Sequence, residues 1–204
     1  EASGDARQIR VAKLRASLDA DNFIDATAEL GLTGEQQLRA EWTAALPNLE
    51  KFSTFSGRRE LPGPDGGRLK GSGKITANLA DWQRQDFSRT VSDVHLEASA
   101  VKWKSGGLES LSVHAGLAGG RIQLQQFKAV INERNVLNAS GGGSIVSPWE
   151  FSAKIDGDMK QLADLNGLMD AFGVQKFVSG KAQIQWEGSG RGGDFSITGG
   201  GTVK

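Results

Sequence analysis

The chain has 204 residues, with 24 lysines and arginines against 24 aspartates and glutamates, so its formal net charge at pH 7 is zero. This balance gives no electrostatic reason to expect a nucleic acid or an anionic membrane surface as a partner. The absence of cysteine excludes a disulfide framework and thiolate metal sites, and no apolar run approaches the roughly 20 residues of a transmembrane helix.

Apolar and polar residues alternate with a period of two over most of the chain, which is typical of a sheet with one solvated face. A shift of phase near Ala12 indicates a β-bulge, and the same shift recurs between Leu124 and Phe127. The pattern predicts an all-β fold of about eleven mostly antiparallel strands, near residues 9–18, 24–32, 38–44, 72–79, 94–100, 111–117, 122–131, 135–145, 151–155, 179–186 and 195–197.

Two segments have helical spacing instead. A short helix is predicted at 47–56, with Leu49 and Phe52 on one side, and a second at 159–173. The turn-rich segment Pro62–Gly67 predicts a loop.

The chain contains an internal repeat. Asn22-Phe-Ile matches Asn135-Val-Leu, and the Leu38–Trp42 strand matches Phe151–Ile155, both at a spacing of 113. After the first loop the best match shifts to 107, with Gly73-Lys on Gly180-Lys. A register held over several elements indicates two tandem units. We predict a first β repeat at 1–118, with the helix at 47–56 and an extra strand pair at 92–118, and a second at 119–204, with the helix at 159–173. Because the chain lacks an initial methionine and stops within a strand-like segment, we interpret it as a fragment of a longer protein.

Motifs that carry chemistry are weak. Gly188–Gly193 has the G-x-G-x-x-G spacing, but a strand-like segment follows it where a dinucleotide site needs a helix, so it predicts a hairpin turn. The only two histidines, His95 and His114, alternate with apolar neighbours and are therefore expected on the solvated face. Nothing in the sequence signals convergent partners for them. We expect no catalytic residue, no metal site, no cofactor and no enzymatic activity.

The inward positions are unusually small, with many alanines and glycines among the larger apolar residues. A sandwich core is close-packed and about 10 Å deep, so it usually holds larger side chains there. Such rows make either a thin closed core or an apolar groove that is left open to accept acyl chains. The pattern alone favours the closed core.

Three segments resemble the AsmA-like superfamily, most closely the C-terminal region of TamB-type translocation and assembly proteins. They are Phe151-x-Ala-x-Ile155, Leu162-Ala-Asp-Leu165 and Val178-Ser-Gly-Lys-Ala-Gln-Ile-Gln-Trp186. The first copy, Leu38 to Leu79, resembles them too. The resemblance implies an elongated sheet curled into a half-pipe, the β-taco, whose apolar groove is open. The two helices and the Pro62–Gly67 loop are irregular for an uninterrupted half-pipe and predict that helices cap or plug it.

The resemblance also implies a function. It predicts a non-enzymatic lipid-conduit segment for phospholipid transport, outer-membrane protein assembly, or both. The segment would lie in the periplasm of a diderm bacterium, in a protein anchored in the inner membrane by a segment outside this chain, with a BamA-like outer-membrane barrel protein as partner. The alternative is a structural spacer or docking module with a closed core, whose strand edges pair with partner strands. The expected groove lining comprises Ala26, Ala28, Leu30, Leu38, Ala40, Trp42, Ile75, Ala77, Leu96, Ala98, Val113, Ala115, Leu124, Ala129, Ile131, Ala139, Gly141, Ile145, Ala153, Ala182, Ile184 and Trp186.

Overall fold

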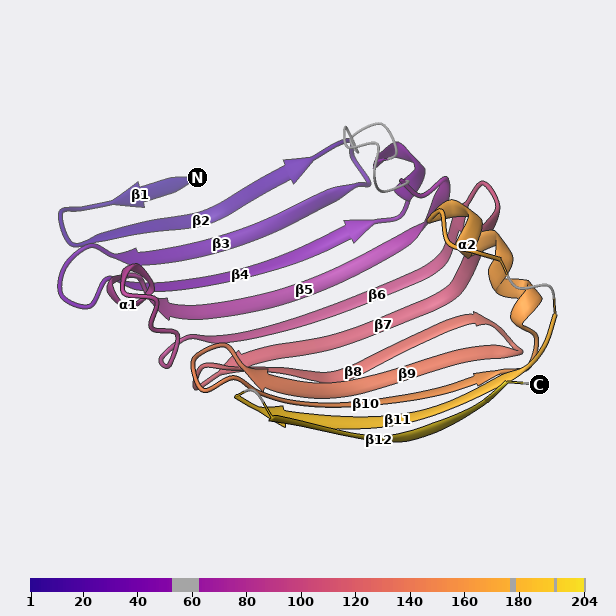
Figure 1. Ribbon diagram of the computed structural model, residues 1–204. Helices are drawn as coiled ribbons and strands as arrows, with labels where there is room; N and C mark the ends of the chain where they lie inside the picture. Colours follow the sequence, from indigo (N-terminus) through magenta and orange to yellow (C-terminus); the bar gives the residue numbers. More distant parts are fainter. Residues whose placement is uncertain (53–62, 177–178, 193, 204) are drawn as a thin grey trace.

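The computed structural model describes residues 1–52, 63–176, 179–192 and 194–203. These residues form one curled layer of twelve antiparallel strands, in which each strand pairs with its neighbours in chain order (Figure 1). The strands are β1 (Ala2–Gly4), β2 (Gln8–Ser17), β3 (Phe23–Gly31), β4 (Gln37–Leu46), β5 (Gly66–Asn78), β6 (Val91–Trp103), β7 (Gly106–Ala118), β8 (Arg121–Asn132), β9 (Asn135–Ser144), β10 (Glu150–Met159), β11 (Ala182–Arg191) and β12 (Asp194–Val203).

The predicted all-β curled half-pipe is confirmed. The strand that the sequence did not predict is β1, whose three residues are too few to show a period of two. Within the described residues all strands belong to this one sheet, and no second sheet lies over it.

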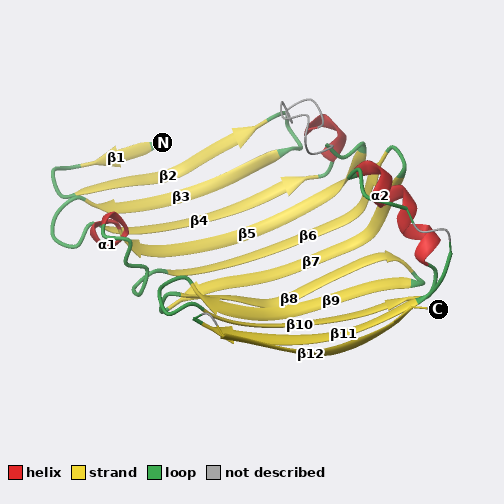
Figure 2. Cartoon of the chain, in the orientation of Figure 1, coloured by secondary structure: helices red, strands yellow, loops and turns green. Residues whose placement is uncertain are grey.

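Helical segments are short and lie at the ends of the strands (Figure 2). The 3-10 turns η1 (Leu49–Phe52) and η2 (Leu162–Leu165) and the helix α2 (Asn166–Ala171) occupy the two predicted helical segments. The first begins two residues later than predicted, and the second is shorter than predicted at both ends. Residues 53–56 of the first lie outside the described residues. In the second, Met159 belongs to β10. Strand β5 begins at Gly66, so the end of the predicted 62–67 loop is strand.

A further helix, α1 (Leu79–Gln83), stands where the sequence was irregular, at the opposite end of the strands (Figure 2). Its N-cap is Asn78, whose side chain accepts hydrogen bonds from the next two free amides. The buried carboxylate of Asp81 accepts hydrogen bonds from Arg84 and Arg89, and Arg89 also binds Glu35. The hydrogen bond from Arg89 is the largest cause of the lowered pKa of Asp81. This ion network fixes the connection between β5 and β6.

The register places the apolar residues on one side of the sheet, because directly opposed residues of antiparallel strands point to the same face. One row of opposed residues crosses ten strands without a break. We call the side that carries it the apolar face and the other the polar face. From β2 to β11 the row is Leu14, Ala26, Trp42, Gly73, Val94, Ala115, Leu124, Gly141, Ala153 and Gly188.

The small residues of the apolar face make room for large side chains that lie flat across them. A Cβ atom built on Gly73 would stand 2.5 Å from Nε1 of Trp42. One on Gly188 would stand 2.6 Å from the Trp186 ring. Aromatic side chains that cover strand glycines help to hold the register of a sheet. The glycines therefore indicate a thin single-layer surface.

We predict that Gly73→Ala lowers the free energy of unfolding by about 1–2 kcal/mol, because the new methyl group displaces the Trp42 ring from its contact. The matched control is Gly200→Ala on the polar face, where a Cβ atom has nothing within 4 Å. Both substitutions change the unfolded chain alike, so chemical denaturation of the two variants isolates the contact. Equal stability of the two variants would contradict the account.

The two halves of the chain share one pairing register. Residues Leu30↔Leu38 pair in β3–β4 and Gly143↔Phe151 in β9–β10, so both partners are shifted by 113. The bulges are also equivalent, since the register shifts between Val11 and Leu14 in one half and between Leu124 and Phe127 in the other. The predicted bulges are confirmed.

The predicted change of spacing to 107 is wrong. The pairs Leu46↔Leu69 and Met159↔Ala182 give 159 − 46 = 182 − 69 = 113, so Leu69 rather than Ile75 corresponds to Ala182. The glycine-lysine match that suggested 107 does not reflect equivalent places in the sheet. The correspondence between the two halves ends at the next pair of strands. In the first half α1 lies between β5 and β6, whereas in the second half a tight turn at Gly192 joins β11 to β12.

Two fully buried asparagines occupy equivalent places in the two halves. Oδ1 of Asn22 accepts the backbone N–H of Asn48 at 3.1 Å, just before η1. Oδ1 of Asn135 accepts that of Gln161 at 3.2 Å, just before η2. Both pairs are separated by 26 residues. Each asparagine fixes the point where a 3-10 turn leaves the sheet, because a buried amide needs its partner.

Candidate functional site

The apolar face is covered at one end of the strands and open over the rest. At the covered end, Leu49 of η1 packs on Ala98 and Val101, and Leu162 of η2 packs on Met159 and Ala182. Helix α2 extends this cover towards the β6–β7 hairpin. The hydroxyl group of Ser105 donates to the carbonyl of Gly167 at 2.9 Å, and the Trp103 ring meets the Phe172 ring edge-on at 5.6 Å between centroids.

Away from this end, large apolar side chains remain in contact with solvent. The exposed fraction is 59% for Leu14, 49% for Ile122 and 45% for Phe151. None of the paired positions on the apolar face of the described strands β2–β11 carries a charged residue. Contiguous exposed apolar surface of this kind is uncommon on a monomer and usually marks a binding surface.

The structure brings the predicted groove-lining residues together on the apolar face. All of them lie in strands on this face except Ile145, which follows the end of β9. They do not share one environment, since Ala77, Ala98, Ala129 and Ala182 are buried while Ile184 is 37% exposed. Sequence reasoning omitted several residues of the same rows, although the alternation could have found them: Leu46, Leu69, Val94, Leu111, Phe127, Leu137 and Ile155.

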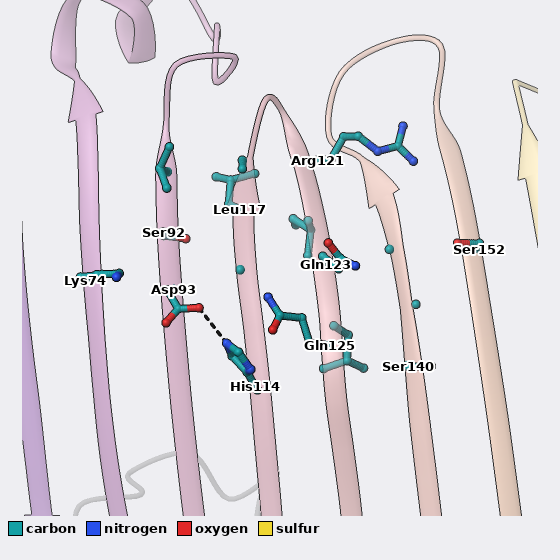
Figure 3. A pocket seen from close by; sticks show the side chains of 17 residues that line it. Lys74, Ser92, Asp93, His114, Leu117, Arg121, Gln123, Gln125, Ser140 and Ser152 are labelled. Carbon is teal, nitrogen blue, oxygen red and sulfur yellow. Dashed lines mark hydrogen bonds and ion pairs between the residues drawn. The ribbon is translucent and has the colours of Figure 1, made fainter.

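The polar face carries serine, threonine, glutamine and charged residues, and it is hollowed across β5–β10. One hollow has a volume of about 820 Å³, and its polar-face lining includes Lys74, Asp93, His114, Gln123 and Ser152 (Figure 3). The hollow lies beside the bulge in β8, where the register shifts opposite His114 and Ala115. A bulge bends its strand and increases the local twist.

The two histidines lie on the polar face, as predicted, but they converge on a shared partner. His95 and His114 stand directly opposite each other on β6 and β7. Their rings are stacked with 3.7 Å between centroids, and both bind the carboxylate of Asp93. The hydrogen bond with His114 is the largest cause of the lowered pKa of Asp93, and the hydrogen bond with His95 lowers this pKa further. No signal of this convergence is present in the sequence.

Comparison with known proteins adds no relative: no protein-family model, curated protein or solved structure matches the chain. Among the described residues no helix is both long and apolar enough to cross a membrane.

Proposed function

We propose that the apolar face binds phospholipid acyl chains and forms a segment of a non-enzymatic lipid conduit. The observation that carries the proposal is the unbroken row of apolar and small residues across ten strands. In the part of the chain that the structure describes, no second layer covers this row. Apolar surface left in water costs about 25 cal/mol per Å². An acyl chain lying on this face would remove that cost, and no charged side chain in the paired rows opposes it.

The arrangement of the face suits a long flexible ligand better than a compact one. Its apolar side chains lie flat over glycines, as Trp42 lies over Gly73, so the surface is smooth. The sheet is curled along its length (Figure 1). The hydrophobic effect is non-directional and scales with area, so such a surface would hold acyl chains without recognising one chain length.

The resemblance to the AsmA-like superfamily supports the same proposal and extends it. It adds a periplasmic location in a diderm bacterium, an inner-membrane anchor elsewhere in the protein and a BamA-like barrel protein as partner. It also adds a role in phospholipid transport, outer-membrane protein assembly, or both. These extensions rest on the resemblance alone.

A docking module is the second candidate, and the edge of β12 favours it. Among the described strands, β12 pairs only with β11, over ten residue pairs. Its other edge presents backbone N–H and C=O groups that a partner strand could pair with. This candidate concerns the edge of the sheet, whereas the conduit concerns its face.

Photo-crosslinking combined with native mass spectrometry separates the two candidates. Probes at Ala139 and Ile184 stand on the apolar face, and matched probes at Asn138 and Gln185 are their chain neighbours on the polar face. We expect phospholipid to co-purify and to crosslink at 139 and 184 only. A lipid-free protein, or equal crosslinking on both faces, would contradict the conduit. Crosslinks to a protein from a probe at Thr198 of β12 would support docking.

A charge placed on the apolar face should release the lipid. We predict that Ala139→Glu lowers phospholipid occupancy more than tenfold, because burying a carboxylate beneath an acyl chain costs more than the 1.4 kcal/mol that corresponds to tenfold in affinity. Asn138→Glu adds the same charge to the other face and should retain the lipid. Lipid extraction and quantitative mass spectrometry of both variants give the comparison. Equal loss would mean that net charge, rather than the apolar face, governs binding.

A further inference from the structure

We propose that Asp93, His95 and His114 form a binding site for a divalent transition-metal ion on the polar face. The inference is independent of lipid binding, which uses the opposite side of the sheet. The three residues offer one carboxylate oxygen and two imidazole nitrogens, and these ligand atoms all lie within 4.8 Å of one another. Two imidazoles and a carboxylate are a set of donors that zinc takes in proteins, with water in the fourth position.

Two of the distances between donor atoms approach those of a tetrahedral zinc site. Nε2 of His114 lies 2.8 Å from Oδ1 of Asp93, and Nε2 of His95 lies 3.0 Å from Oδ2. Zinc–ligand distances of about 2.0–2.2 Å place neighbouring ligand atoms about 3.3–3.6 Å apart in a tetrahedron. The nitrogen and oxygen atoms of each pair therefore need to separate by about half an ångström. The stacked rings, whose planes differ by 25°, would also turn so that both Nε2 atoms point to the ion. In the metal-bound form each imidazole would carry its proton on Nδ1, leaving Nε2 free to coordinate.

Strand pairing positions the three side chains before any ion arrives. Asp93 and His95 are two residues apart on β6, so both point to the polar face, and His114 stands opposite His95 on β7. The side chains of Asp93 and His114 are about three-quarters buried, while His95 is half exposed. An ion could therefore enter from the hollow that Asp93 and His114 line (Figure 3). Once bound, it would link β6 to β7 across the face.

Titration of the tag-free, metal-free chain with Zn²⁺ tests the site. Because the chain has only two histidines, the side-chain ¹⁵N signals of histidine report on this site alone. We expect one equivalent of Zn²⁺ to bind and to shift the Nε2 signals of both histidines. Stoichiometric binding that leaves either histidine unchanged, or no binding at all, would overturn the proposal.

Substitutions then distinguish a specific Zn²⁺ site from nonspecific attraction of Zn²⁺ to carboxylates. Asp93→Asn and His114→Asn should each weaken Zn²⁺ binding at least tenfold, since even the outer partners of metal ligands contribute about 10–100-fold. The control is Glu97→Gln, which removes a carboxylate from the same face of β6 outside the cluster and should leave affinity unchanged. Equal losses in Asp93→Asn and Glu97→Gln would overturn the site. If His114→Asn fails to fold, the histidine signals of the unmodified chain still decide.

Discussion

Replacing Leu162 with alanine is expected to lower the free energy of unfolding by about 2–5 kcal/mol. The Leu162 side chain is 4% exposed and packs on Met159 and Ala182, with Leu137 and Leu165 against the same cluster. It begins η2 and seats the η2–α2 segment on the apolar face. In a single-layer sheet few residues are buried this fully, so the loss of one large side chain removes a large share of the core. Urea denaturation followed by tryptophan fluorescence measures the change.

Leu14→Ala is the control, because it makes the same chemical change on the same face. Leu14 is 59% exposed, and we expect its truncation to cost only about 0.5 kcal/mol. Comparable losses for Leu14 and Leu162 would mean that the apolar face is covered at Leu14 as it is at Leu162, which would also contradict the proposed open surface. The equivalent leucine of the first half, Leu49, belongs to a cluster that shares no residue with that of Leu162. Combining Leu49→Ala with Leu162→Ala should therefore be additive within about 0.5 kcal/mol.

The faces of the sheet could be predicted from the sequence because alternation is a local property. Ile24 and Asp25 point to opposite sides whatever strand lies beside them. The equivalence of the two halves could also be predicted from the sequence, but only up to η1 and η2. Up to these turns the strands and loops of the two halves have equal lengths. The 107 spacing was wrong because a match of Gly73-Lys74 with Gly180-Lys181 compares residue types and not pairing partners.

The contact between the histidines could not be predicted from composition or spacing. His95 and His114 are 19 residues apart, and their meeting depends on the register of the β6–β7 hairpin. That register is set by the two-residue turn Lys104-Ser105, which lacks the Asn-Gly or Asp-Gly signature of a tight hairpin. A shift of one residue would have moved one histidine to the apolar face. The Asp93 cluster therefore becomes visible only once the pairing is known.

The role of the small inward residues could not be decided from the sequence. Alanine and glycine rows fitted a thin closed core as well as an open groove, because a row seen in one strand does not reveal what lies across it. In the structure Trp42 lies over Gly73 and Leu96 over Gly71, each on the neighbouring strand. Large and small residues alternate across the strands as well as along them. This pairing is what allows a single layer to present a continuous apolar surface.

Replacing Asn135 with alanine should lower the free energy of unfolding by about 2–4 kcal/mol. Its side-chain amide donates to the backbone carbonyl of Gln161 at 3.1 Å and to Asp164 at 3.2 Å, and its Oδ1 accepts the Gln161 N–H. Alanine leaves two backbone groups of Gln161 without these partners, and an unsatisfied buried group costs about 1–3 kcal/mol. Faster hydrogen exchange of the Gln161 amide gives a local measurement. Asn138→Ala on the polar face is the control, with little change expected.

Substituting Asn22, the equivalent asparagine of the first half, tests what the asparagine itself contributes, because the charged residues around it differ from those around Asn135. There Asn22 donates to Asp19, which also pairs with Lys51. The positions equivalent to Asp19 and Lys51 in the second half are Asn132 and Asp164. The carboxylate therefore precedes the asparagine in the first half and follows it in the second. Hydrogen bonds from Lys51 and Asn22 hold the pKa of Asp19 well below its usual range. We expect Asn22→Ala to cost about 1–3 kcal/mol, since only one backbone group, the Asn48 N–H before the 3-10 turn, loses its partner. A loss confined to one half would assign the stabilisation to the surrounding charges instead.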